Sequence, residues 1–206
     1  MNLSSDMSAL IDQLEPISRP SGLGRVLMVM GTSRGAGAST VAREISRLSA
    51  VRSTRGVWLF DLDFKANAQA EACRVRADVF DLSLGRETPW VLDGNARLVG
   101  RPSSVDKLVV SKVERRDGTR LQAALRGAPD YWSAVRQSID LAVIDAPGQS
   151  RAPMNLVADM DGVILVVDAR ADNFDGLHAR RDAIEAAGGV VAGVVVNRAG
   201  AYRSAA

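Results

Sequence analysis

The sequence predicts an α/β protein in which a doubly wound, mostly parallel sheet is flanked by helices. Three observations support this class. Short apolar runs of strand length recur along the chain, for example at residues 26–30 and 162–167, and such runs are typical of strands buried on both faces. Segments whose apolar residues have helical spacing separate the runs, which indicates strand–helix–strand units. A glycine-rich turn joins the first run to the first helical segment.

The length and composition suit one such domain with short extensions. The chain has 206 residues, of which 47% are hydrophobic, enough for a sizeable core. We expect an N-terminal helix and linker over residues 1–24, the main domain over 25–198 and a short tail over 199–206. In the first segment, Met7, Leu10, Ile11 and Leu14 have helical spacing.

The charge and the cysteine content narrow the class of protein. The formal net charge is only +2, from 26 Lys and Arg against 24 Asp and Glu, so we expect no nucleic-acid partner. A single cysteine, Cys73, excludes an intrachain disulfide and favours a cytoplasmic protein. No apolar run approaches the ~18 residues that span a bilayer. We therefore expect no direct insertion into a membrane.

The first apolar run, Val26 to Met30, predicts a buried strand. The glycine-rich turn follows it, and a helical pattern begins at Ser39 and Thr40. Backbone N–H groups in such a turn, together with the positive end of the helix dipole, form a cradle for phosphate groups. The candidate nucleotide-binding residues of this cradle are Arg34, Gly35, Ala36, Gly37, Ala38, Ser39 and Thr40.

The turn departs from the P-loop pattern Gly-x-x-x-x-Gly-Lys-Ser/Thr at two positions. With Ser39 at the last position, Gly37 matches the second glycine, but Thr32 stands at the first. Ala38 stands where the pattern has the lysine that contacts phosphate oxygens. Arg34 is the only cation left in the turn and is a candidate for part of the missing charge.

Two later apolar runs end in carboxylates. Residues 56–63 end in Asp61 and Asp63, whose i, i+2 spacing would place both on one face of a strand. Residues 140–145 end in Asp145, and a strand-end acid of this kind holds magnesium in P-loop enzymes. We therefore take Asp61 and Asp63 as catalytic candidates, and Ser39, Asp61 and Asp145 as ligands for Mg²⁺. Gln149 either orients water or is a surface loop residue.

The remaining segments continue the predicted alternation of strands and helices. We expect a helix at 68–72, a strand at 108–113, two short helices around residues 121–125 and 132–135, a strand at 161–168, a helix through 174–184 and a last strand at 190–196. Trp90, in the less readable stretch 65–105, is interpreted as a core residue. The last strand leads into Asn197 and Arg198.

Over residues 25–198 the chain resembles the ParA/MinD-like P-loop ATPases. Within them it is most similar to the cytoplasmic bacterial tyrosine autokinases of capsule and exopolysaccharide assembly. Those kinases have a Gly-x-Gly-Lys-Ser/Thr loop, an apolar run ending in Asp-x-Asp and a second run ending in Asp-x-Pro. The corresponding segments here are 35–39, 59–63 and 143–147, and segments 158–168 and 193–198 are similar as well.

The resemblance implies cofactors, partners and further site residues. The cofactors would be ATP or ADP with Mg²⁺, and Asn197, followed by Arg198, would lie near the adenine. The protein would form a dimer or a larger homo-oligomer. Its partner would be a membrane polysaccharide co-polymerase, which would bring a cytoplasmic chain to the inner membrane.

The chain also departs from the autokinases. Ala38 replaces the phosphate lysine, and Ser33 stands at the signature lysine of the ParA/MinD proteins. The C-terminal tyrosine cluster is missing, since Tyr131 and Tyr202 are the only tyrosines. We therefore expect a nucleotide-binding, catalytically impaired regulator of exopolysaccharide synthesis and export. The alternatives are a positioning ATPase for DNA, pili or cell poles, and a scaffold that binds no nucleotide.

Overall fold

The computed structural model describes residues 9, 11–12, 22–115, 121–148, 150–170 and 174–199. Three of the four apolar residues of the predicted N-terminal helix, Met7, Leu10 and Leu14, lie outside this set. The same is true of Gln149, Tyr202 and the tail from residue 200 onward. The predictions made for these residues stay predictions.

The main sheet has eight strands in the order β10-β9-β1-β8-β2-β6-β5-β3. The first six of these are parallel neighbours, whereas β5 and β3 pair antiparallel at one edge. The strands span β1 Arg25–Gly31, β2 Val57–Asp61, β3 Phe80–Asp81, β5 Arg97–Pro102, β6 Leu108–Glu114, β8 Leu141–Ala146, β9 Gly162–Asp168 and β10 Val191–Asn197. A separate antiparallel pair joins β4 (Trp90–Leu92) to β7 (Ala123–Leu125).

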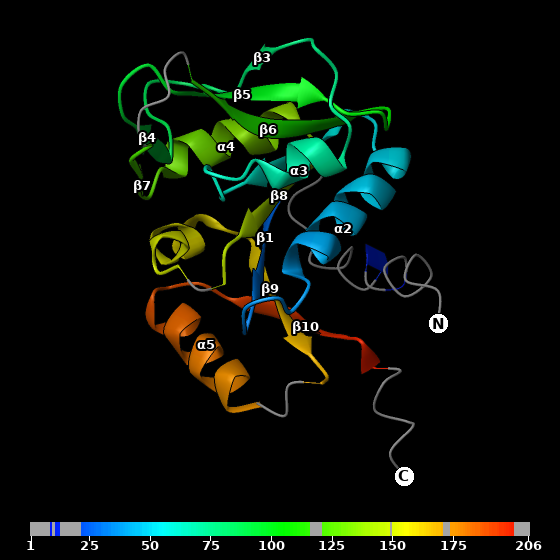
Figure 1. Cartoon of the computed structure of the whole chain (residues 1–206), viewed down its shortest axis with the longest axis vertical. Helices are drawn as coiled ribbons and strands as arrows, with labels where there is room; N and C mark the ends of the chain where they lie inside the picture. The colour runs from blue at the N-terminus through cyan, green and yellow to red at the C-terminus, as the bar shows by residue number, and fades with distance from the viewer. Residues whose placement is uncertain are drawn as a thin grey trace.

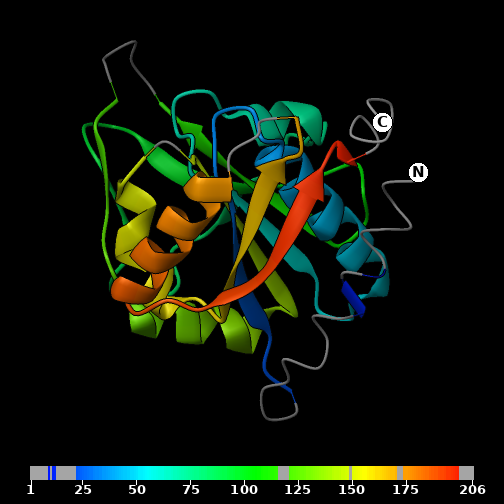
Figure 2. The same ribbon diagram turned by 90° about the horizontal axis from the view of Figure 1, so that it is seen from below.

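Helices cover both faces of the sheet, as Figure 2 shows for α2 and α5. On one side lie α2 (Ala38–Arg52) and the short α3 (Ala68–Ala72); on the other lie α4 (Pro129–Ser138), the 3-10 helix η1 (Ala152–Asp159) and α5 (Phe174–Ala186). Along β1, Val26 and Met28 face the second layer, while Leu27 and Val29 face the first. This alternation buries the side chains of residues 26–30 in one or the other core layer. The predicted doubly wound α/β class is confirmed.

An aromatic cluster closes the core under α4. Phe60 lies edge-on to Trp132 with ring centroids 5.6 Å apart, and Trp90 lies edge-on to Tyr131 at 5.2 Å. Edge-to-face pairs of this kind contribute about 0.5–1.5 kcal/mol beyond the area they bury. Trp90 is 6% exposed, so its interpretation as a core residue is confirmed.

One predicted helix is wrong. The apolar spacing of Leu121 and Leu125 led us to expect a short helix, but residues 123–125 form β7 and pair with β4, with Leu125 opposite Trp90. A segment of three residues is too short to complete stable helical turns, and the cross-strand packing of Leu125 on Trp90 favours the strand. The second predicted helix, around Trp132 and Val135, is present as α4.

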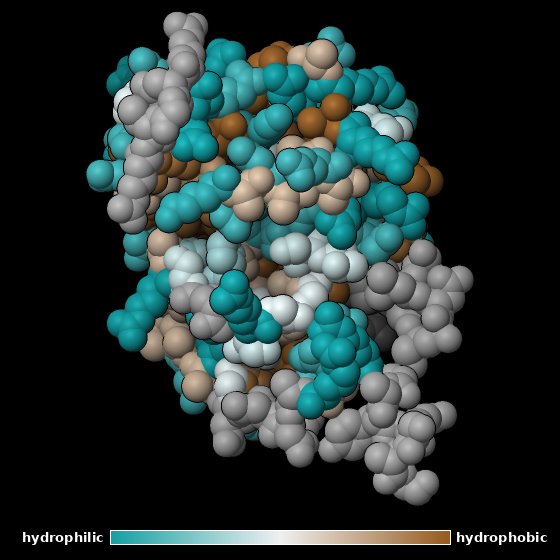
Figure 3. All heavy atoms as spheres, in the orientation of Figure 1, coloured by the Kyte–Doolittle hydropathy of each residue, from teal (hydrophilic) through white to brown (hydrophobic). Residues whose placement is uncertain are grey.

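The surface shown in Figure 3 is mainly hydrophilic, with hydrophobic residues in separate small groups. Figure 1 places β10 at one edge of the sheet and β3 at the other. Among the described residues, no helix is both long enough and apolar enough to cross a lipid bilayer.

Candidate functional site

The turn between β1 and α2 has the backbone of a phosphate cradle. Gly35 and Gly37 adopt left-handed conformations, with φ of 76° and 96°, which side chains rarely tolerate. A Cβ on Gly37 would lie 2.2 Å from the Asn197 side-chain nitrogen. Both glycines are therefore required by the path of the turn, independent of any ligand.

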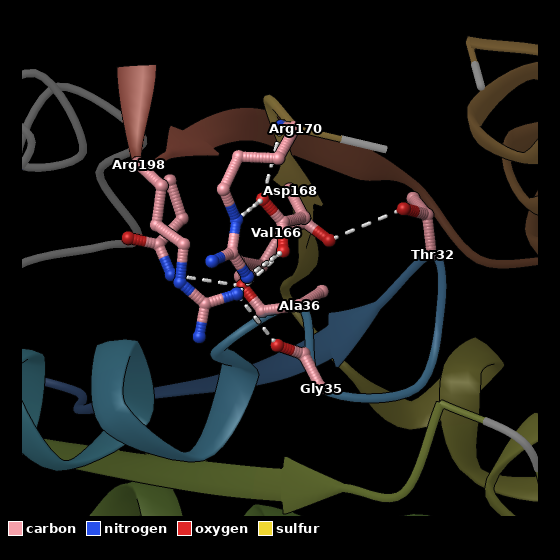
Figure 4. Close-up of polar contacts among 8 residues, drawn as sticks. Thr32, Gly35, Ala36, Val166, Asp168, Arg170 and Arg198 are labelled. Atoms are coloured by element: carbon pink, nitrogen blue, oxygen red, sulfur yellow. Dashed lines mark hydrogen bonds and ion pairs between the residues drawn. The ribbon is translucent and has the colours of Figure 1, made fainter. Parts of the chain in front are cut away.

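The turn is held from outside through its carbonyl groups. The Asn197 side-chain amide donates to the Ala36 carbonyl at 2.9 Å, and the Arg198 guanidinium donates to the Gly35 carbonyl at 3.0 Å. Arg198 also pairs with Asp168 at the end of β9, which accepts from Arg170 as well. Figure 4 shows both guanidinium groups converging on this carboxylate beside the turn. The ends of β9 and β10 therefore fix the turn.

The anchors use the carbonyl groups of the turn and leave several of its N–H groups unpaired. Within the part of the chain that the structure describes, the backbone N–H groups of Gly35, Gly37, Ala38 and Ser39 have no hydrogen-bond acceptor. Helix α2 begins at Ala38 without a side-chain cap. Unpaired donors at a helix N-terminus, together with its dipole, form a site for anions such as phosphates.

The side chains of the turn supply little positive charge. Ala38 carries a methyl group at the lysine position, and a Cβ placed on Gly31 would lie 3.7 Å from it. Arg34 is exposed and makes no hydrogen bond or ion pair with any other described residue. The cradle therefore relies on backbone dipoles, with Arg34 as the one cation free to move toward a ligand among the described residues of the turn.

The predicted acids come together beside this cradle. Asp61 ends β2 and is the register partner of Asp145 on β8. Both are buried, 4% and 6% exposed, and the Asp145 carboxylate accepts a hydrogen bond from the Ser39 side chain. The three predicted magnesium ligands, Ser39, Asp61 and Asp145, therefore share one place at the carboxyl ends of adjacent strands, where α/β folds bind their ligands.

Asp63 does not share a strand face with Asp61, so that expectation is wrong. The strand ends at Asp61, and the N–H of Asp63 turns back to donate to the Asp61 carboxylate at 2.9 Å. The Asp63 side chain is exposed and accepts from the N–H of Ala66. It borders a groove of about 640 Å³ whose lining includes Phe64, Lys65 and Pro147.

The two buried acids resist ionisation. The pKa of Asp61 is raised to about 6, mainly by burial and also by the negative charge of Asp145, against the opposing effect of the hydrogen bond from the Gln69 backbone. Burial also raises the pKa of Asp145, although hydrogen bonds from Gln69 and Ser39 and the charge of Arg43 act to lower it. Carboxyl groups with this behaviour are typical of functional sites.

Gln69 is a site residue that our sequence reasoning missed. Its side chain, 1% exposed, lies between the acids and donates to Asp145 at 2.6 Å and to the Ser39 carbonyl at 2.8 Å. Its backbone N–H donates to Asp61 at 3.0 Å, and Arg43 donates to its side-chain oxygen at 3.1 Å. A lone glutamine in a predicted helix gives no sequence signal of such a role.

The residues therefore fit a magnesium ion in chemistry but not in arrangement. Two carboxylates and a hydroxyl are the hard oxygen ligands that Mg²⁺ prefers. However, N–H donors from Gln69 and Asp63 already lie on the carboxylate oxygens.

Comparison with known proteins supports the fold. No family model and no curated protein matches the chain. The kinase domain of Escherichia coli tyrosine kinase ETK has a similar structure, with a TM-score of 0.66 at 14% identity over 95% of this chain and 77% of that one. The VpsO kinase domain gives 0.63 at 16% identity over 95% and 94%.

ATPases of the ParA/MinD type are similar as well. The cell-division ATPase MinD of Pyrococcus furiosus gives a TM-score of 0.55 at 15% identity over 87% of this chain and 74% of that one. A nucleotide-binding protein of Archaeoglobus fulgidus, solved in complex with ADP, gives 0.51 at 16% identity over 94% and 70%. The chain therefore has the fold shared by bacterial tyrosine kinase domains and MinD-type P-loop ATPases.

Proposed function

We propose that this chain binds ATP or ADP in the turn after β1 with little or no turnover, and regulates bacterial exopolysaccharide synthesis and export. The observation that carries the proposal is a phosphate cradle with free N–H donors that has lost its lysine at Ala38. The similarity to an ADP complex supports a nucleotide as the ligand. The similarity to the ETK and VpsO kinase domains supports the kinase-like part of the proposal.

The loss of the lysine affects catalysis more than binding. A hydrogen bond to a charged group contributes roughly 1.5–3 kcal/mol, so its absence weakens binding by about ten- to a hundredfold. Charge that develops on a transferred phosphoryl group needs preorganised cations, and an arginine in that role contributes about 10³–10⁵ in rate. The exposed Arg34 is the remaining candidate in the turn.

The burial of Tyr131 supports the loss of autokinase activity at this tyrosine. The Tyr131 side chain is 2% exposed, and its hydroxyl donates to the Leu82 carbonyl at 2.8 Å. A phosphate cannot reach this hydroxyl without opening the core under α4. Tyr202 is the other tyrosine of the chain and lies outside the described residues.

The partner and the location follow from the resemblance to the autokinases. We propose a membrane polysaccharide co-polymerase as partner, self-association as a dimer or larger homo-oligomer, and a cytoplasmic protein held at the inner membrane through that partner. The magnesium site at Ser39, Asp61 and Asp145 stays a prediction, and the hydrogen bonds that Gln69 donates to both carboxylates argue against it.

Calorimetric titration of the purified protein with ATP and ADP tests the binding, and release of phosphate from ATP tests turnover. We expect micromolar binding and no steady turnover. Steady hydrolysis at ordinary enzyme rates that disappears in Asp61→Ala would contradict catalytic impairment. If no heat is released at millimolar ATP or ADP, nucleotide binding is wrong and the chain is a scaffold.

Capture from detergent-solubilised membranes of the source bacterium tests the regulatory role. We expect a membrane polysaccharide co-polymerase among the captured proteins. Deletion of the gene should alter the amount or the chain length of surface polysaccharide. The regulatory role would be contradicted if the deletion strain had unchanged polysaccharide and no membrane protein were captured.

A positioning ATPase is the second candidate, and the similarity to MinD favours it. The nearly balanced charge of the chain gives it less support, because DNA-bound relatives need a basic surface. Binding to DNA that requires ATP and weakens steeply with salt would favour this candidate over the first.

A further inference from the structure

The Gln69 amide has one chemically allowed orientation. Its side-chain oxygen accepts from the guanidinium of Arg43, which can only donate. Its NH₂ group therefore faces Asp145 and the carbonyl of Ser39, which accept. In the opposite orientation the side-chain oxygen would face two acceptors, and the NH₂ group would face a guanidinium that can only donate. The NH₂ group thus lies where a cation would otherwise meet the carboxylate.

The surrounding groups hold this glutamine from three elements. Arg43 comes from the second turn of α2, Asp61 from the end of β2 and Asp145 from β8. The backbone N–H of Gln69 donates to Asp61 while its side chain donates to Asp145. Gln69 therefore bridges both carboxylates of the predicted magnesium site. The Arg43 guanidinium, which donates to the side-chain oxygen of Gln69, adds a positive charge next to this bridge.

We propose that Gln69, backed by Arg43, is an internal replacement for the metal ion, so that this protein binds its nucleotide without Mg²⁺. A hydrated Mg²⁺ would have to remove the Gln69 NH₂ group from Asp145 and take a place near a guanidinium. Both steps cost free energy, since the buried amide loses two hydrogen bonds and like charges approach each other. The inference rests on the proposed nucleotide binding, yet the filling of the acid pair by Gln69 is testable without nucleotide.

The first experiment needs no nucleotide, and its measurement is made on the unmodified protein. The chain has five glutamines, so labelling their side-chain amides with ¹⁵N gives a simple NMR spectrum, and the spectrum of Gln69→Ala identifies the Gln69 signals. Mn²⁺, a paramagnetic substitute for Mg²⁺, is then added to the unmodified protein. We expect the Gln69 signals to persist at millimolar Mn²⁺, no broader than those of the exposed Gln137.

Loss of the Gln69 signals at Mn²⁺ equimolar with the protein, before any change at Gln137, would overturn the proposal. That result would mean that the metal enters the acid pair in spite of the amide.

The second experiment measures nucleotide affinity with Mg²⁺ and with EDTA. For the unmodified protein we expect dissociation constants that differ by less than about twofold. Gln69→Ala should instead bind nucleotide about tenfold or more tightly with Mg²⁺ than with EDTA, because the acid pair becomes open to the ion. Gln137→Ala is the matched control and should behave like the unmodified protein.

The two proposals fail in different ways. If no variant binds nucleotide under any condition, the proposed function is wrong, and the Mn²⁺ experiment still decides the role of Gln69. If the unmodified protein binds nucleotide and loses about tenfold or more in affinity with EDTA, the role of Gln69 is wrong and nucleotide binding stands.

Discussion

At the scale of single residues, the site combines an intact backbone with altered side chains. The turn keeps the two left-handed glycines and the free N–H groups that hold phosphates. Two side chains set the charge of the site: Ala38 carries no charge at the lysine position of the P-loop pattern, and the neutral Gln69 lies between the acids. On the proposed function, this backbone binds the anionic nucleotide, and the missing lysine weakens phosphoryl transfer.

Restoring the lysine should strengthen binding. In Ala38→Lys we expect nucleotide affinity to rise by about ten- to a hundredfold, because a charged hydrogen bond to phosphate is regained. Calorimetry with ADP measures the change. Ala186→Lys, an exposed position at the far end of α5, adds the same charge away from the turn and should leave the affinity unchanged. Equal effects of the two variants would mean that only the overall charge matters.

At the scale of elements, the turn depends on the ends of β9 and β10. Asn197 and Arg198 are bonded to the carbonyls of the turn. The resemblance to the autokinases makes both residues nucleotide-binding candidates. Their contact with adenine stays a prediction. Their position gives them a second role, which is to aim the turn's N–H groups by holding its carbonyls.

Removing one anchor should loosen the turn. In Asn197→Ala the hydrogen bond to Ala36 is lost, which costs about 1 kcal/mol and lowers nucleotide affinity about fivefold. Hydrogen exchange of the amides in residues 33–40 should become faster even without nucleotide. Arg181→Ala, an exposed arginine on α5, is the control. Unchanged exchange in Asn197→Ala would show that the turn holds its shape without the anchor.

A buried ion pair joins α4 to the sheet. Arg136 and Asp161, 8% and 4% exposed, are 3.0 Å apart, and Asp161 also accepts from the N–H of Val26 at 2.7 Å. Asp161→Ala leaves the guanidinium buried without its partner, so we expect a loss of about 3–5 kcal/mol in the free energy of unfolding. Urea denaturation measures it. The double variant with Arg136→Met should recover much of the loss; if it recovers none, the pair is not the cause.

The sequence predicted elements well where one pattern dominates. Apolar runs predicted the strands β1, β2, β8, β9 and β10, and helical spacing predicted α2. The structure contains all of these elements. The failures have local physical causes. Asp63 lies beyond the strand because the chain turns back on the Asp61 carboxylate, and β7 forms because it pairs with β4. Gln69 was missed because its role depends on three elements that meet only in the folded chain.

At the scale of the whole molecule, the two ends of the sheet have different roles. The carboxyl ends of the strands hold the cradle and the acids. The opposite end joins distant parts of the chain. There the Asp140 carboxylate accepts from the backbone N–H groups of Thr54 and Arg55 and from the Arg55 side chain. The backbone of Asp140 is bonded to Arg25 and Gly56, so this residue links the starts of β1, β2 and β8.

Because of this link, we expect the free energy of unfolding to depend on pH at acidic pH. Burial acts to raise the pKa of Asp140, but hydrogen bonds from Arg55 and Thr54 outweigh it and hold the pKa at about 2, below the ordinary 3.8. The folded pKa is depressed, so the ionised carboxylate stabilises the folded state above pH 3.8, and this contribution is lost as the pH falls through about 2.

Asp140→Asn should therefore unfold at a lower temperature than the unmodified protein at neutral pH. The difference in Tm should shrink between pH 3.8 and about 2, where Asp140 of the unmodified protein takes up its proton. Thermal unfolding followed by circular dichroism across this range measures both. Asp182→Asn removes an exposed carboxylate from α5 and should show no such convergence. A Tm difference that stays constant down to pH 2 would mean that the charge of Asp140 contributes nothing, and that its hydrogen-bond geometry alone joins the strands.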